Sequence, residues 1–245
     1  MKIASCMFLL LCALTAHAVT DAPVTDARIV AEQAYDEAKS HYETNKSNVD
    51  SAWQFACACF DLADLSTKNS TRAAYAQEGI DASRAALKLR PNSAAAHYYL
   101  GMNIAQLAQT KTLGALSLVR QMETQWNIAV KLDRHVDFAG PDRNLGLLYR
   151  DAPGAPLSIG SRVDALQHLL TAVALNPEYP ENHLNLIESQ IKWGQIAEAQ
   201  RECDKYVKTI PQARKNLTGP KWAGPWHDWD IRLQEIQSKL RRHGS

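Results

Sequence analysis

The sequence predicts an all-α protein, an α-solenoid of about four helix-turn-helix repeats with capping helices at both ends. Three observations support this prediction. The 245-residue chain is 46% hydrophobic and 22% charged, which is typical of a folded protein. One spacing of small, large and proline residues recurs along most of the chain. The segments at both ends carry amphipathic helical patterns that differ from the repeats, as capping segments do.

Residues 1–18 have the features of a signal peptide. Lys2 supplies the positive charge, residues 7–14 are apolar, and Ala16-His17-Ala18 is a small-x-small cleavage site. The apolar stretch is too short to cross a bilayer as a helix. We therefore expect an exported chain that starts near Val19, in the periplasm or secreted, without stable membrane insertion. An uncleaved N-terminal anchor is the alternative.

Charge and cysteine content exclude several classes of function. Of the 27 basic residues, only Lys2 lies in residues 1–18, and no acidic residue does, so 26 residues of each sign remain. This balance argues against nucleic acid or an anionic membrane as a partner. Three cysteines remain, an odd number, so they cannot all pair into a complete disulfide framework. We expect Cys57, Cys59 and Cys203 to be buried as small apolar side chains, with a bridge from Cys57 or Cys59 to Cys203 as the alternative.

Residues 19–48 form the predicted N-terminal capping helix. Within them, residues 25–43 read as an amphipathic helix whose apolar side includes Ile29, Ala34 and Tyr35.

Residues 49–214 form the predicted repeat array. The tetratricopeptide (TPR) pattern is W-x2-L-G-x2-Y on a first helix, A-x3-F on a second helix, and then a proline that ends the second helix. The four first helices carry Trp53, Leu100-Gly101, Leu145-Gly146-x2-Tyr149 and His183-x2-Leu186. The four second helices carry Ala86, Ala129, Ala165-x3-Leu169 and Ala199-x3-Cys203, and the prolines are Pro91, Pro177 and Pro211. Small residues let paired helices approach closely, and large residues fill the opposite space.

Three repeats have extra residues between their two helices. These fall at residues 66–71, 110–115 and 151–161, and the last is rich in glycine, proline and serine, which predicts a loop.

Residues 215–245 are predicted to form an aromatic connector, residues 216–229, and a C-terminal capping helix, residues 228–242. Trp222, Trp226 and Trp229 lie in this connector. We expect them to fill the core, with closure of one end of a binding groove as the alternative.

One stretch goes beyond the generic repeat skeleton. It reads Gly140-Pro141-Asp142-Arg143-x-Leu145-Gly146-x-Leu148-Tyr149, followed by Ala152-Pro153-Gly154. Residues 52–211 resemble a group of bacterial exported TPR proteins. This group resembles the T-component associated with TRAP transporters and, more distantly, the TPR domains of the regulator of microtubule dynamics proteins. The resemblance to the T-component implies an accessory role beside a substrate-binding protein in solute uptake, and it carries over no catalytic residue.

No motif predicts catalysis, a cofactor or a metal site. The eight histidines form neither H-E-x-x-H nor a pair at i, i+4, and no G-x-S-x-G or phosphate-binding loop is present. His97 and His183 take equivalent places in two repeats, which favours packing over metal binding. Residues 133–142 contain three aspartates but no calcium-loop spacing, so we expect a helix end and a turn there.

The first helices of a TPR array line a concave groove. Arg143 and Arg150 are seven residues apart on one helix face and could hold a carboxylate, or instead pair with Asp142 and Asp151. The sequence thus predicts a non-catalytic scaffold that holds a protein or peptide partner. A small-solute-binding accessory protein is the alternative, and an enzyme of unrecognised chemistry is a third, weaker one. The candidate groove residues are Tyr98, Met102, Ala105, Arg143, Leu147, Arg150, Glu188 and Lys192.

Overall fold

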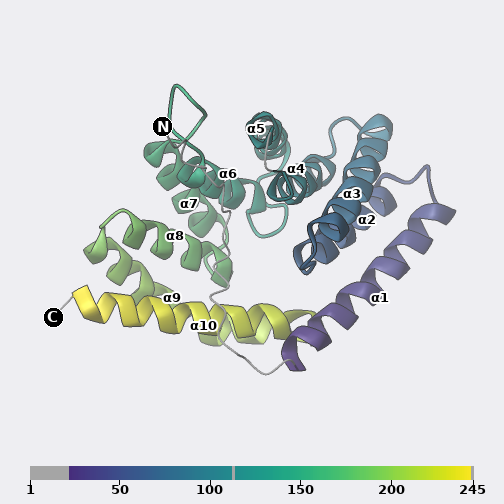
Figure 1. Cartoon of the computed structure of the whole chain (residues 1–245). Helices are drawn as coiled ribbons and strands as arrows, with labels where there is room; N and C mark the ends of the chain where they lie inside the picture. The colour runs from purple at the N-terminus through teal and green to yellow at the C-terminus, as the bar shows by residue number, and fades with distance from the viewer. Residues whose placement is uncertain (1–21, 112–113, 244–245) are drawn as a thin grey trace. The chain divides into compact units, whose positions relative to one another are not determined.

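The computed structural model describes residues 22–111 and 114–243 (Figure 1). The predicted signal peptide lies outside these residues. The described chain contains ten helices and no strand beyond one isolated bridge between Gly154 and Gly160, which confirms the all-α prediction. The helices are α1 (Ala22–Thr44), α2 (Val49–Asp64), α3 (Asn69–Leu89), α4 (Ala94–Gln109), α5 (Ala115–Leu132), α6 (Gly140–Asp151), α7 (Arg162–Leu175), α8 (Pro180–Lys192), α9 (Ile196–Asn216) and α10 (Pro220–His243).

The described chain divides into two compact units. Unit 1 comprises residues 31–133 and 151–161, and unit 2 comprises residues 22–30, 134–150 and 162–243. Within each unit, consecutive helices pack in pairs, as the repeats predict. None of the described helices combines the length and the hydropathy needed to cross a membrane.

Polar caps fix where two first helices begin in unit 1. The Asn48 side chain accepts hydrogen bonds from the backbone N–H groups of Asp50, at 2.7 Å, and Ser51, at 3.2 Å. The Ser93 hydroxyl accepts one from the N–H of Ala96, at 3.3 Å. Such caps satisfy N–H groups that have no partner within the helix, and each contributes about 1 kcal/mol.

A small residue permits a close helix contact in unit 1. A side chain at Gly101 of α4 would overlap the Trp126 indole of α5. The indole N–H instead donates to the backbone carbonyl oxygen of Tyr98, at 3.2 Å. The signature glycine therefore receives the bulky residue opposite it, which is the packing that the repeat pattern predicts.

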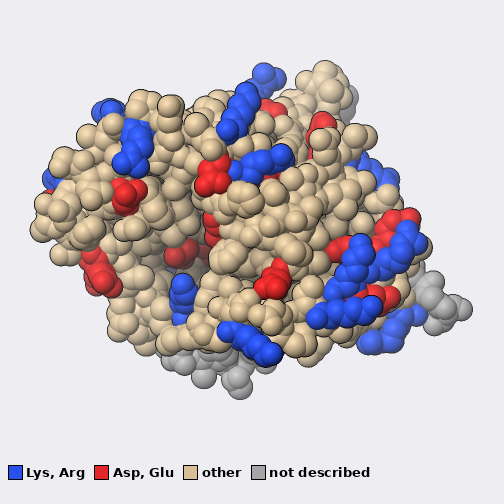
Figure 2. Space-filling model, turned by 180° about the vertical axis from the view of Figure 1, so that it is seen from behind, with Lys and Arg blue, Asp and Glu red and all other residues tan. Residues whose placement is uncertain are grey.

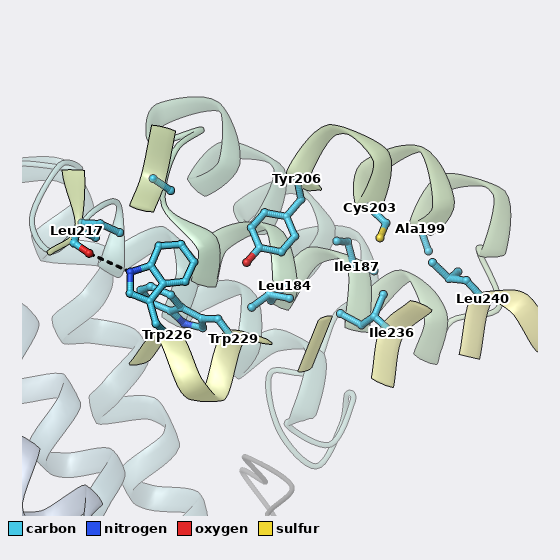
Figure 3. Packing of buried hydrophobic residues seen from close by; sticks show 11 residues of the cluster. Leu184, Ile187, Ala199, Cys203, Tyr206, Leu217, Trp226, Trp229, Ile236 and Leu240 are labelled. Carbon is cyan, nitrogen blue, oxygen red and sulfur yellow. Dashed lines mark hydrogen bonds between the residues drawn. The ribbon is translucent and has the colours of Figure 1, made fainter. Parts of the chain in front are cut away.

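One hydrophobic core cluster of unit 2 is built by α8, α9 and α10 (Figure 3). Trp229 is 2% exposed and Trp226 is 8% exposed, and the Trp226 N–H donates to the Leu217 carbonyl oxygen at 2.9 Å. The prediction that these tryptophans fill the core is confirmed for Trp226 and Trp229. Trp222 is only partly buried against the same cluster.

Two helix boundaries differ from the sequence prediction. Pro211 lies inside α9 rather than ending it, and α10 begins at Pro220, so most of the predicted connector is helical. The burial of Ala213 and Leu217 beyond Pro211 explains the first difference. An interior proline costs about 3 kcal/mol, and the core contacts of the last turn offset that loss.

Within the described chain, Cys57, Cys59 and Cys203 form no disulfide. Cys59 and Cys203 are buried, and Cys57 is half-buried. Burial raises the pKa of the thiols of Cys59 and Cys203, so both are unreactive apolar side chains.

Candidate functional site

The predicted groove residues are divided between the two units. Tyr98, Met102 and Ala105 lie on α4 of unit 1, and the other five lie on α6 and α8 of unit 2. The Tyr98 side chain is 0% exposed and packs edge-on against Tyr99, with ring centroids 4.9 Å apart. Tyr98 therefore belongs to the interior and does not face a partner. Ala105 is also buried, and Met102 is half-buried.

Arg143 lies at the centre of a hydrogen-bond network in unit 2. Its side chain is 7% exposed, and its Nη2 donates to the Asp137 carboxylate at 2.6 Å. Its Nη1 donates to the carbonyl oxygens of Asp137 and Phe138, both at 3.2 Å, and to Asn182 Oδ1 at 3.1 Å. The guanidinium carbon lies 5.1 Å from the Tyr179 ring centroid. Arg143 thus binds its own chain, and its ion-pair partner is Asp137 rather than Asp142.

Arg143 holds a strained turn. Asp137, Phe138 and Ala139 have φ angles of 48°, 53° and 64°, three consecutive non-glycine residues in the left-handed region. Each such residue costs about 1–2 kcal/mol. Asn182 provides a second support, because its Nδ2 donates to the Phe138 carbonyl oxygen at 3.0 Å. The predicted turn in residues 133–142 is present, but the sequence does not predict its left-handed backbone conformation.

The turn presents an aromatic side chain at the surface. Phe138 is 37% exposed, and its ring stacks on Tyr179 with centroids 4.4 Å apart and planes 8° apart. The Trp222 ring stands edge-on to both, at 5.9 Å from Phe138 and 6.3 Å from Tyr179. We call Phe138, Tyr179 and Trp222 the aromatic surface. The sequence prediction missed Phe138 and Tyr179, although both are aromatic residues in or beside predicted turns.

The face of α8 that carries Glu188 is covered by α10. Glu181, Asn185 and Glu188 lie four and three residues apart on this face. Arg232 donates to Glu188 from Nε at 2.9 Å and from Nη2 at 3.0 Å. It also donates to Glu181 at 2.8 Å and to Asn185 Oδ1 at 2.7 Å. The predicted groove residue Glu188 therefore has a partner within the chain.

The ion pairs between α8 and α10 shift the pKa values of Glu181 and Arg232. Burial alone would raise the pKa of Glu181, but Arg232, with Arg143 and the Trp229 N–H, lowers it below its ordinary value. Burial alone would lower the pKa of Arg232, but Glu181 and Glu188 raise it well above its ordinary value. These bonds attach α10, the C-terminal capping helix, to α8.

The remaining predicted residues of unit 2 differ in exposure. Leu147 is half-buried and Lys192 is exposed. Arg150 is half-buried, and its Nη1 donates to the Ser189 hydroxyl of α8 at 3.2 Å. Arg143 and Arg150 thus both reach α8 from α6.

Asp142 is a buried acid on α6. Arg134 donates to its two carboxylate oxygens at 2.9 and 2.7 Å, and His168 Nδ1 lies 2.8 Å from one of them. Burial opposes ionisation, but these partners lower the pKa of Asp142 below its ordinary value. His168 therefore has a structural contact.

His97 and His183 make the same contacts in their two repeats. His97 Nδ1 lies 2.7 Å from Gln125 Oε1, and its Nε2 lies 2.9 Å from the Pro91 carbonyl oxygen. His183 Nδ1 lies 2.7 Å from Glu202 Oε1, and its Nε2 lies 2.7 Å from the Pro177 carbonyl oxygen. Each histidine ties its first helix to the second helix and to the preceding turn, as the packing prediction requires.

Surface charge does not single out a site on the face that Figure 2 shows. Basic and acidic side chains lie intermixed there, and they are densest toward the lower right of the view. The aromatic surface and its supporting turn are therefore the candidate site, because they combine exposed aromatic area with backbone strain.

The chain was compared with family models, curated proteins and solved structures. A family model described as "Regulator of microtubule dynamics protein 1-3" matches residues 18–137. No curated protein matches the chain. Among solved structures, the crystal structure of yeast Tom70 is similar over 83% of this chain and 65% of that chain, with 11% identity and a TM-score of 0.28. This chain thus spans about two thirds of the Tom70 chain. The family match supports the TPR-like part of the predicted resemblance, and bacterial origin and a transporter relation stay predictions.

Proposed function

We propose that this chain is an exported, non-catalytic scaffold that holds a protein or peptide partner. The TPR-like pairing of helices supports a protein-interaction role. The predicted signal peptide in residues 1–18 motivates export. The aromatic surface of unit 2 is the contact that we assign to the partner.

One observation carries the proposal: Phe138 is held at the surface by a strained turn. The chain places three residues in the left-handed region and uses the buried Arg143 and Asn182 to keep them there. Strain of this kind persists only where the surrounding structure enforces it, and it concentrates at functional sites.

The composition of the surface fits recognition of a protein or peptide. Aromatic side chains are enriched at the centres of protein interfaces, where they bury large areas at a low entropic cost. Phe138 and Tyr179 already stack, so the platform is formed before the partner arrives. A preformed contact lowers the ordering cost of binding.

Affinity capture tests the proposal. Tagged protein comprising residues 19–245 is used to capture partners from an extract of its source cell, in parallel with Phe138→Ala and Val163→Ala. Val163 is the matched control, because it is an apolar side chain of unit 2 that is 76% exposed. We expect a specific partner that is lost with Phe138→Ala and retained with Val163→Ala. Equal capture by all three proteins would contradict the assignment of the surface. Capture of nothing would favour the small-solute alternative, which native mass spectrometry of the purified protein then tests.

Export has a separate test. Mass spectrometry of the protein purified from its source cell gives the N-terminal residue directly. We expect Val19 at or near the N-terminus, and an intact Met1 would contradict cleavage.

A further inference from the structure

The two equivalent histidines of the array differ in the residue that faces Nδ1 of the ring. His97 on α4 faces Gln125 of α5. His183 on α8 faces Glu202 of α9. Gln125 and Glu202 take the same register in their second helices, one residue before the central residue of the buried face. The two contacts therefore have the same place in the repeat but different chemistry, because one partner is an amide and the other is a carboxylic acid.

The His183 ring has an oxygen acceptor at each nitrogen. Its Nε2 lies 2.7 Å from the Pro177 carbonyl oxygen, and its Nδ1 lies 2.7 Å from Glu202 Oε1. A carbonyl oxygen only accepts hydrogen bonds, so Nε2 carries a proton. A neutral imidazole has a single N–H, and its Nδ1 would then present a lone pair to the carboxylate. The short contact between Nδ1 and Oε1 therefore requires a second proton between these two atoms.

The surroundings of Glu202 favour its ionised form. Lys205 donates to the other carboxylate oxygen, Oε2, at 3.1 Å. Burial alone would raise the pKa of Glu202, but His183 and Lys205 lower it below its ordinary value. The side chains of His183 and Glu202 are 3% and 6% exposed, so water has little access to the bond between them. Loss of the shared proton would therefore leave two buried polar atoms without a bond.

The helices packed against α8 contribute further titratable groups, which are Lys205 and Tyr206 on α9, Asp230 and Arg232 on α10, and His168 on α7. Tyr206 stacks on the His183 ring with centroids 5.4 Å apart, and burial raises the pKa of Tyr206, which keeps it uncharged. Asp230, Arg232 and His168 each contact other residues. These groups therefore do not take the place of Glu202 beside Nδ1.

His97 provides the neutral counterpart. Its Nε2 lies 2.9 Å from the Pro91 carbonyl oxygen, and its Nδ1 lies 2.7 Å from the Gln125 amide. An amide has both a donor and an acceptor, and a half-turn of the group exchanges them, so Gln125 can donate to an unprotonated Nδ1. A single ring proton, on Nε2, therefore satisfies both contacts of His97.

We propose that His183 and Glu202 form a pH-sensitive latch between α8 and α9, closed while a proton lies between Nδ1 and Oε1 and open once that proton is lost. Linkage fixes the direction, because a bond that requires a bound proton contributes to stability on the acid side of its titration and is lost as the pH rises. The latch lies within unit 2. It adds a response to pH to the scaffold and depends neither on the aromatic surface nor on a partner.

Nitrogen NMR of the imidazole rings tests the proposal. The protein comprising residues 19–245, labelled with a heavy nitrogen isotope, is titrated from pH 5 to pH 9, and the ring signals are assigned with His97→Gln and His183→Gln. We expect His183 to bind its second ring proton at least tenfold more tightly than His97 does. Equal proton affinities of the two rings would overturn the proposal.

Protein variants show whether the carboxylate is responsible. Glu202→Gln recreates the chemistry of the pair of His97 and Gln125, and we expect it to lower the proton affinity of His183 at least tenfold. Lys205→Met is the matched control on α9, because it removes the other contact of Glu202 but keeps the carboxylate, and the proton affinity should not fall. An unchanged affinity in Glu202→Gln, or an equal fall in Lys205→Met, would overturn the proposal. Circular dichroism shows that each variant is folded, and the comparison of His183 with His97 in the wild type needs neither variant.

Discussion

Replacing Arg143 by methionine tests how the strained turn is held. The substitution keeps the aliphatic part of the buried side chain but removes at least four hydrogen bonds, including the one to the Asp137 carboxylate. Loss of one partner from a buried ion pair costs about 3–5 kcal/mol. Two features place the expected cost of Arg143→Met near the lower end of this range. Asp137 is 29% exposed and regains water, and the Phe138 carbonyl keeps its bond from Asn182.

We therefore expect Arg143→Met to lower the free energy of unfolding by about 3 kcal/mol in urea titrations followed by tryptophan fluorescence. Arg150→Met is the matched control on the same helix face. It removes a hydrogen bond to the Ser189 hydroxyl, and we expect a loss of about 1–2 kcal/mol. Hydrogen exchange of residues 133–144 should also accelerate in Arg143→Met, because the turn loses its support. A loss below about 1 kcal/mol, or one equal to that of Arg150→Met, would refute the reasoning.

Three further predictions concern stability. Ion-pair partners lower the pKa values of Glu181 and Asp142, so both carboxylates contribute fully to the free energy of unfolding above about pH 4.5, the ordinary carboxylate range, and this contribution is lost as the pH falls through the lowered pKa values. Urea midpoints measured from pH 6 to pH 3 should therefore fall, and midpoints that do not change with pH would contradict these ion pairs. Gly101→Ala should cost about 1–3 kcal/mol in the same titration because its methyl group meets Trp126, and a neutral result would show that α4 and α5 separate easily. Gly219→Ala should cost about 1–2 kcal/mol because φ is 94° at this position, and a stabilised variant would argue against this backbone conformation.

Much of the fold follows from the sequence because the repeat signature is a packing rule. The signature places small residues such as Gly101 and Gly146 opposite large ones, and those contacts are present. The equivalence of His97 and His183 also follows from repeat position, and both make corresponding bonds. These features depend on residues at fixed spacing, which is what a sequence records.

The boundaries near the C-terminus could not be predicted in the same way. Pro211 and Pro220 act locally as helix signals, but Ala213, Leu217 and Trp226 decide the outcome through burial in the core of unit 2. Such contacts join residues from different helices, so tertiary packing overrides the local preference at Pro211.

The candidate site was only partly predictable. Arg143 and Arg150 were expected on one face of α6, and both reach α8. Spacing alone does not reveal that Asp137 supplies the ion-pair partner of Arg143. Nor does it reveal the left-handed turn, since Asp, Phe and Ala at positions 137–139 carry no glycine signal. The aromatic surface depends on this turn and therefore emerges only in the structure.

Site-specific photo-crosslinking tests the central claim most directly. A benzophenone amino acid is introduced at residue 138, with residue 163 as the matched exposed position, and the source cells are irradiated. We expect a discrete crosslinked partner from residue 138 and none from residue 163. Crosslinks at residue 163 alone, or at neither position, would contradict a partner-binding role for the aromatic surface.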